Sequence, residues 1–138
     1  MNTYNINDKN IDNLLAYQNF IKNNEGVGYL KIRAYGASEA VPIEGMNIEV
    51  STLLEDNTRL VFFDDKTDAS GMIEKLKLPA PKEGSDNLIA PSKTVYDIKA
   101  SYDGIEENFK VNLYDGICVQ QIISVVPNTL VRGLSYGD

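Results

Sequence analysis

The chain has 138 residues, of which 43% are hydrophobic and 24% are charged, and this predicts one globular domain whose core needs no disulfide or metal. Its net charge of −7 argues against binding to nucleic acid or to an anionic membrane, because both require a basic protein surface. The single cysteine, Cys118, excludes an internal disulfide.

No targeting or membrane segment is visible in the sequence. The first ten residues, MNTYNINDKN, are polar and lack the apolar region of a signal peptide. No apolar run approaches the roughly 18 residues that a membrane helix needs. We therefore expect a cytoplasmic protein with no membrane insertion.

Residues 1–26 are predicted to form an N-terminal helix and a linker. In NIDNLLAYQNFIKNNEG the apolar residues recur at helical spacing over residues 10–23. Asp8 or Asn10 could cap the start of this helix, and Gly26 follows its end. We expect the helix to pack on its own domain. The alternative is a docking helix for another chain, with Leu14, Leu15, Phe20 and Ile21 as the interaction residues.

Residues 27–127 are predicted to form a β-sandwich, because the apolar period changes to two. In residues 29–35, for example, Lys31 and Arg33 alternate with the apolar side chains and face the other way. Residues 59–64 are apolar on both faces and indicate a central strand. The tail, 128–138, has no clear period and is predicted to be loosely held. The predicted strands are 29–35, 46–52, 59–64, 72–78, 94–102, 108–114 and 117–126.

Turn residues suggest how these strands connect. Asp103-Gly104 predicts a hairpin over residues 94–114. Strand 72–78 is expected to end at Pro79, because proline cannot donate to a strand ladder. The proline-containing segment 79–93 is long enough to cross from one sheet to the other. The predicted fold is mainly β, a seven-stranded Greek-key β-sandwich with a short N-terminal α-helix. Its core should bring together Ile32, Ile48, Phe62, Ile98, Val111 and Ile123.

An ordered series of motifs supports this fold: GYLKIRAY (28–35), AVPIEG (40–45), FDDKTDASG (63–71), KLPAP (77–81), TVYDIKASYDG (94–104) and GICVQQIISVVP (116–127). The series resembles the carboxypeptidase regulatory-like, or transthyretin-like (prealbumin-like), β-sandwich family over residues 26–127. Within that family it is most similar to small proteins of spore-forming Gram-positive bacteria. The resemblance implies an accessory module, mostly non-catalytic, that accompanies peptidases, peptidoglycan hydrolases or surface proteins.

The sequence offers little catalytic chemistry. It contains no histidine, which removes Ser-His-Asp and Cys-His triads, the commonest general base and the commonest zinc ligand. We therefore expect no catalytic residue and no cofactor. Cys118 lies between Ile117 and Val119 and is expected to be a small core or semi-buried hydrophobic side chain.

The acidic turn FDDKTDASG holds the best metal candidates, Asp64, Asp65 and Asp68. A calcium loop of the EF-hand type needs oxygen donors at its first, third and fifth positions. Counted from Asp64, the third position is Lys66, so the pattern fails. We expect a solvated turn with no metal.

These observations predict a non-catalytic structural or protein-interaction module, linked to the cell envelope or spore of a Gram-positive bacterium. The alternative is an accessory module that binds peptidoglycan or another glycan; an enzyme is the third and disfavoured class. A protein partner, self-association and a glycan are the partners left open, and nucleic acid is excluded by charge. Strand tyrosines could stack on sugars or anchor a protein interface, but we expect them to be half-buried in the sandwich with their hydroxyls bonded; they are Tyr35, Tyr96, Tyr102 and Tyr114.

Overall fold

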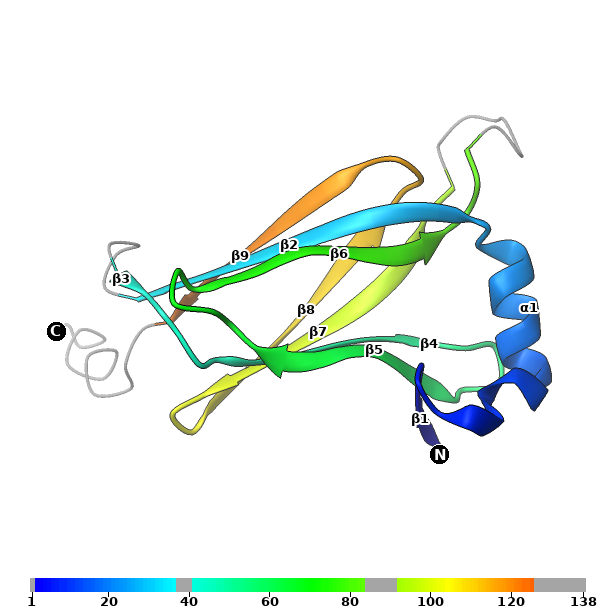
Figure 1. Cartoon of the computed structure of the whole chain (residues 1–138), viewed down its shortest axis with the longest axis horizontal. Coiled ribbons are helices and arrows are strands. Elements are labelled where there is room, and N and C mark those ends of the chain that lie inside the picture. Colours follow the sequence, from blue (N-terminus) through cyan, green and yellow to red (C-terminus); the bar gives the residue numbers. More distant parts are fainter. Residues whose placement is uncertain (1, 37–40, 84–91, 126–138) are drawn as a thin grey trace, which may run out of the picture.

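The alternating segments form strands in two sheets that lie one above the other, with a short helix at one end (Figure 1). The computed structural model describes residues 2–36, 41–83 and 92–125. Its strands are β1 (Thr3–Asn5), β2 (Gly26–Gly36), β3 (Val41–Pro42), β4 (Asn47–Leu53), β5 (Arg59–Lys66), β6 (Met72–Ala80), β7 (Thr94–Tyr102), β8 (Ile105–Leu113) and β9 (Cys118–Val125), and its helices are the 3₁₀ helix η1 (Lys9–Asn13) and α1 (Leu15–Asn23).

The two sheets have five and four strands. The larger has the order β1-β5-β4-β7-β8. In the smaller, β2 is central: it pairs antiparallel with β6 and β3 along one edge and parallel with β9 along the other. All seven predicted strands are present, so the predicted β-sandwich with one short α-helix is confirmed. Strands β1 and β3 are additional, and their few residues show no alternation that sequence could reveal.

The predicted connections also appear, with one correction. Asp103 and Gly104 both have positive φ, 51° and 79°, as a tight two-residue hairpin requires, and β7 pairs with β8. Strand β6 lies in one sheet and β7 in the other, so the chain between them crosses the sandwich; residues 84–91 of that crossing are outside the described residues. The prediction that the strand ends at Pro79 is wrong. Strand β6 runs through Pro79 to Ala80, because it is an outer strand, where a missing N–H is tolerated.

The core lies between the sheets. Of the six residues predicted to face inward, five are buried: Ile32, Ile48, Ile98, Val111 and Ile123. The sixth, Phe62, is half-buried and contacts both this core and the residues under the helix. Its ring lies edge-on to Tyr96, with centroids 5.6 Å apart.

The N-terminal segment packs on the sandwich by two routes. Strand β1 pairs parallel with β5, which makes it the outer strand of the larger sheet. Helix α1 and η1 cover a second buried cluster, and the Phe20 ring lies 6.0 Å from that of Phe62. Strand β5 thus places three apolar side chains in the interior: Leu60 in the cluster under the helix, and Phe62 and Phe63 against the main core, beside a register shift in the β4–β5 ladder. The second cluster consists of Ile11, Ala16, Leu54 and Leu60.

The helix begins later than predicted. Residues 9–13 form η1, and the α-helix starts at Leu15. The Asp8 carboxylate does not cap either helix; it accepts a hydrogen bond from the Asn5 N–H at 2.8 Å. Among the residues described, no helix is long and apolar enough to span a membrane.

Candidate functional site: a charged groove on the larger sheet

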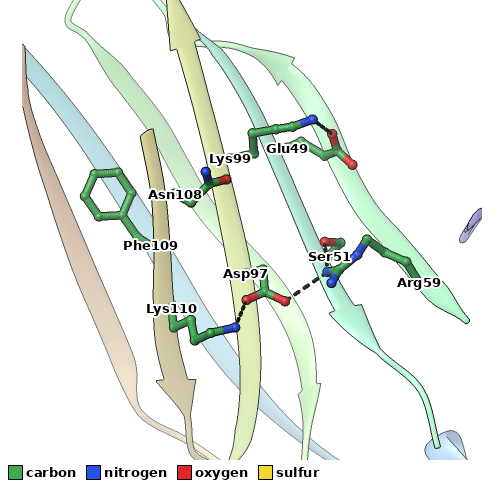
Figure 2. Close-up of a pocket in the computed structure, with 8 residues that line it drawn as sticks. All are labelled: Glu49, Ser51, Arg59, Asp97, Lys99, Asn108, Phe109 and Lys110. Atoms are coloured by element: carbon green, nitrogen blue, oxygen red, sulfur yellow. Dashed lines mark hydrogen bonds and ion pairs between the residues drawn. The ribbon is translucent and has the colours of Figure 1, made fainter. Parts of the chain in front are cut away.

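The outer face of the five-stranded sheet is hollowed over strands β4, β5, β7 and β8 (Figure 2). The hollow, called the charged groove below, has a volume of about 440 Å³. Five of its lining side chains are charged. The groove is lined by Glu49, Ser51, Arg59, Asp97, Lys99, Asn108, Phe109 and Lys110.

Strand alternation and register explain why these side chains meet. In β7, Tyr96 and Ile98 are fully buried, so Asp97 and Lys99 face outward. The strand register then places Asp97 between Ser51 and Lys110 in one row of neighbours across three strands. A second row places Lys99 between Glu49 and Asn108.

Asp97 is the centre of the first row. The Lys110 Nζ donates to its Oδ1 at 2.5 Å, and the Arg59 guanidinium donates to its Oδ2 at 2.9 Å. The same guanidinium nitrogen donates to the Ser51 hydroxyl at 2.9 Å. Burial raises the pKa of Asp97, but the hydrogen bonds and charges of Lys110 and Arg59 outweigh it, so the pKa lies below its ordinary value. The carboxylate is therefore ionised and held by two cations.

The second row is looser. The Lys99 Nζ lies 4.0 Å from the nearest oxygen of Glu49, and half of the Lys99 side chain is exposed. Phe109 points away from the charged side chains (Figure 2). Three cations and two anions line the groove, a net of +1 in a chain of −7. Lys99 and Asn108 are thus the side chains with spare capacity to donate to a bound molecule.

The four candidate interaction residues of the helix divide into two pairs. Leu14 and Phe20 are partly buried against the clusters beneath the helix. Leu15 and Ile21 are exposed, at 67% and 38%. None of the four lines the charged groove. Their role in contacting another chain stays a prediction.

The three aspartates of the acidic turn do not converge. Asp64 and Asp65 are adjacent on β5, so their side chains point to opposite faces of the strand. The Asp68 carboxylate accepts hydrogen bonds from the N–H groups of Ser70 and Met72, at 2.9 and 3.0 Å, and so closes the turn. Across residues 2–36, 41–83 and 92–125, no three histidine, cysteine or acidic side chains are placed to hold a metal ion.

Two further residues can be compared with their predictions: Cys118 departs from its prediction, and Tyr96 lies in the sandwich with its hydroxyl bonded, as predicted for the strand tyrosines. Cys118 is exposed, so its predicted burial is wrong. Ile123 of the same strand is buried, and because Cys118 lies an odd number of residues before it, Cys118 faces the other side of β9. Tyr96 is fully buried, and its hydroxyl donates to the Pro79 carbonyl at 2.6 Å. Tyr96 therefore cannot stack on a sugar at the surface.

The charged groove was not predicted from the sequence, because its residues come from four strands and form no sequence motif. The polar positions of each strand are visible in the alternation, including Asp97 and Lys99. Which strands are neighbours, and which residues are opposite each other, depends on the sheet order. Arg59 adds to the difficulty, because it reaches Asp97 from a strand two places away in the sheet.

Comparison with known proteins gives a fold and no family. No family model and no curated protein matches the chain. Among solved structures, 5-hydroxyisourate hydrolase of Klebsiella pneumoniae is similar, with 14% identity, a TM-score of 0.47, and alignment over 72% of this chain and 90% of that one. Transthyretin of Sparus aurata is also similar, with 18% identity, a TM-score of 0.41, and alignment over 71% and 90%.

One functional prediction is corrected by this comparison. The chain was predicted to be a non-catalytic module, in part because its fold resembles accessory domains. The comparison contradicts that prediction as an inference from the fold, because a structure of similar fold is that of an enzyme, 5-hydroxyisourate hydrolase. At 14% identity the likeness concerns the fold alone and assigns no reaction to this chain. The chain has a transthyretin-like β-sandwich fold.

Proposed function

We propose that the charged groove binds a small polar molecule that carries a carboxylate or another anionic group. The supporting observation is that Lys99 and Asn108, which are opposite each other on β7 and β8, both line a hollow of about 440 Å³. That volume falls within the range of small-molecule sites in proteins. Binding of this kind is the first step of both ligand recognition and catalysis.

The charge of the groove favours an anion. Asp97 is already paired with Arg59 and Lys110, so its negative charge is compensated within the protein. Lys99 has only a distant acidic neighbour, at 4.0 Å, and its ammonium can turn to a ligand. The Asn108 side chain, one strand away, can donate a second hydrogen bond from its amide. A carboxylate placed between these two side chains would accept from both.

The other polar side chains of the groove would orient the rest of the ligand. Glu49 is an acceptor beside Lys99, and the Ser51 hydroxyl, which accepts from Arg59, keeps a proton to donate. A molecule with a carboxylate at one end and a hydroxyl or amine at the other fits this arrangement. Such a ligand would lie across β7, with its anionic group toward β8.

The experiment is an NMR titration of the full chain with succinate, citrate and glutamate as anionic probes and with glycerol as a neutral probe. The anionic probes should shift the amide signals of Lys99 and Asn108, while glycerol should not. Lys99→Met should weaken binding about fivefold, which corresponds to one exposed ion pair of about 1 kcal/mol. Lys66→Met is the matched control, because Lys66 is exposed on β5 outside the groove.

Two results would contradict the proposal. One is that no anionic probe shifts the groove amides at millimolar concentration. The other is that Lys99→Met and Lys66→Met weaken binding equally, which would show a general charge effect.

The predicted cytoplasmic location and the link to a Gram-positive envelope or spore stay predictions from the sequence.

A further inference from the structure

The smaller sheet carries positive charge that the chain as a whole does not. Its three long strands, β2, β6 and β9, contain four cationic residues and a single acidic one, Glu74. This is a net of +3, so the rest of the chain carries −10, since the total is −7. The four cations, called the basic face below, are Lys31, Arg33, Lys75 and Lys77.

These cations lie on the outer side of the smaller sheet. Leu30 and Ile32 of β2 are fully buried, so Lys31 and Arg33 point away from the core. On β6, Lys77 is the register partner of Tyr29, and the Lys75 Nζ lies 4.7 Å from the centre of the Tyr29 ring. The cations of both strands therefore share one surface.

Tyrosine rings position two of these cations. Lys75 lies over the ring of Tyr29, and the Arg33 guanidinium lies 4.8 Å from the centre of the Tyr35 ring. Such contacts attract a cation without neutralising its charge. The rings thus hold the charges in place and leave them available to an anion.

The basic face forms no ion pair with the acidic side chains of the described residues, and Glu74 is the one acidic residue of its strands. Arg59, Lys99 and Lys110 form ion pairs on the larger sheet, whereas none of the four cations of the basic face is within ion-pair distance of an acidic side chain of the described residues. The Nε of Arg33 is moreover a buried donor with no hydrogen-bond partner in the described part of the chain. An unsatisfied buried donor is unfavourable, so this part of the Arg33 side chain has no compensating contact within the described protein.

We propose that the basic face binds an acidic segment of a partner protein. Alternate residues of a strand lie about 6.7 Å apart, so Lys31 and Arg33 match the spacing of alternate acidic side chains in an extended peptide. The rings of Tyr29 and Tyr35 are covered by cations, so they are not free to stack on bases as single-stranded nucleic acid requires. A long polyanion would also meet the negative remainder of the surface, whereas a short acidic segment would not.

The test uses the full chain and a fluorescent 12-residue peptide of alternating glutamate and serine, with fluorescence anisotropy as the readout. The peptide should bind at low salt and dissociate as salt is raised, because the attraction is between exposed charges. A peptide with glutamine in place of glutamate should not bind. A 12-nucleotide oligothymidine should bind more weakly than the acidic peptide.

Matched double variants separate the basic face from general charge. Lys31→Ser with Lys77→Ser should weaken peptide binding about tenfold, since two exposed ion pairs are lost. Lys22→Ser with Lys93→Ser removes the same charge from exposed positions outside the face and should leave binding unchanged. Circular dichroism and the melting temperature will show that both variants are folded; if the first variant is unfolded, Lys31→Ser alone replaces it, with an expected loss of about threefold.

Three outcomes would overturn the proposal: no binding of the acidic peptide, equal weakening in the two double variants, or tighter binding of the oligothymidine. The last would identify the face as a nucleic-acid surface. Because the charged groove lies on the other sheet, Lys99→Met should not affect the peptide. The peptide experiment and the anion titration therefore test the basic face and the charged groove separately, and either proposal can be refuted without the other.

Discussion

Replacement of Tyr96 by phenylalanine tests how the two sheets are joined. Tyr96 belongs to β7 in the larger sheet, and its hydroxyl donates to the carbonyl of Pro79 on β6 in the smaller sheet, at 2.6 Å. The ring is fully buried, so Tyr96→Phe keeps the packing and removes only the hydrogen bond. We expect a loss of about 1 kcal/mol in the free energy of unfolding, or about 2 kcal/mol if no water replaces the donor.

The change of stability with pH gives a second, independent measure of the burial of Tyr96. Burial raises the pKa of the Tyr96 hydroxyl above its ordinary value of 10. Above pH 10 the unfolded chain loses this proton while the folded chain keeps it, so stability falls as pH rises. For this one group the loss is about 1.4 kcal/mol at pH 11. Tyr96→Phe lacks that loss, so the stability difference between the two proteins should move in favour of the variant by about 1.4 kcal/mol between pH 7 and pH 11.

The assay is urea unfolding followed by circular dichroism at pH 7, 9, 10 and 11. Tyr102→Phe is the matched control, because Tyr102 is 38% exposed and should change stability by less than about 0.5 kcal/mol. The reasoning is refuted if Tyr96→Phe loses less than about 0.3 kcal/mol at pH 7. It is equally refuted if the difference between the two proteins stays constant from pH 7 to pH 11.

Three other predictions concern the sheets and the turn. The two cationic partners of Asp97 outweigh its burial and lower its pKa, so the ionised carboxylate should stabilise the fold above about pH 4, and this contribution should vanish as pH falls through the lowered pKa. In urea unfolding between pH 3 and pH 6, the stability of Asp97→Asn should therefore depend less on pH than that of the original protein. Identical slopes for the two proteins would argue against this prediction. Gly71→Ala should lower the free energy of unfolding by about 3 kcal/mol, since φ is +74° and a Cβ would lie 2.5 Å from a main-chain oxygen. Gly104→Ala should lower it by only about 1 kcal/mol, because φ is +79° but no atom lies within 4 Å of the added Cβ. Equal losses in urea unfolding would contradict the steric explanation. Ile98→Ala should cost about 2–4 kcal/mol in equilibrium unfolding because the side chain is fully buried, and a loss below about 0.5 kcal/mol would mean that the strand faces the other way.

The sequence predicted the sandwich because burial imposes a period of two on each strand. Residues such as Ile32 and Ile98 are fully buried, and their polar neighbours face solvent, so alternation was sufficient to identify strands and faces. It could not identify β1, a three-residue strand that depends on pairing with β5. It also misplaced Cys118, because an apolar neighbour on either side does not reveal which face of an edge strand is covered.

The candidate sites were harder to predict, for a related reason. The charged groove requires Arg59 and Lys110 to reach Asp97 from different strands, and no local pattern specifies that adjacency. The basic face was closer to prediction, because Lys31 and Arg33 alternate outward within one strand. Its second half, Lys75 and Lys77, required the pairing of β2 with β6.

The parallel pairing of β2 with β9 has a consequence for biosynthesis. Tyr29 is the register partner of Cys118, so the centre of the smaller sheet joins an early segment of the chain to a late one. Parallel contacts between distant segments form slowly. During translation, the backbone groups of β2 that face this edge, such as the Tyr29 N–H that donates to the Ile117 carbonyl at 3.0 Å, therefore stay unpaired until β9 has left the ribosome. For most of synthesis the nascent chain therefore exposes an open strand edge, which is an aggregation risk if translation stalls before β9 emerges.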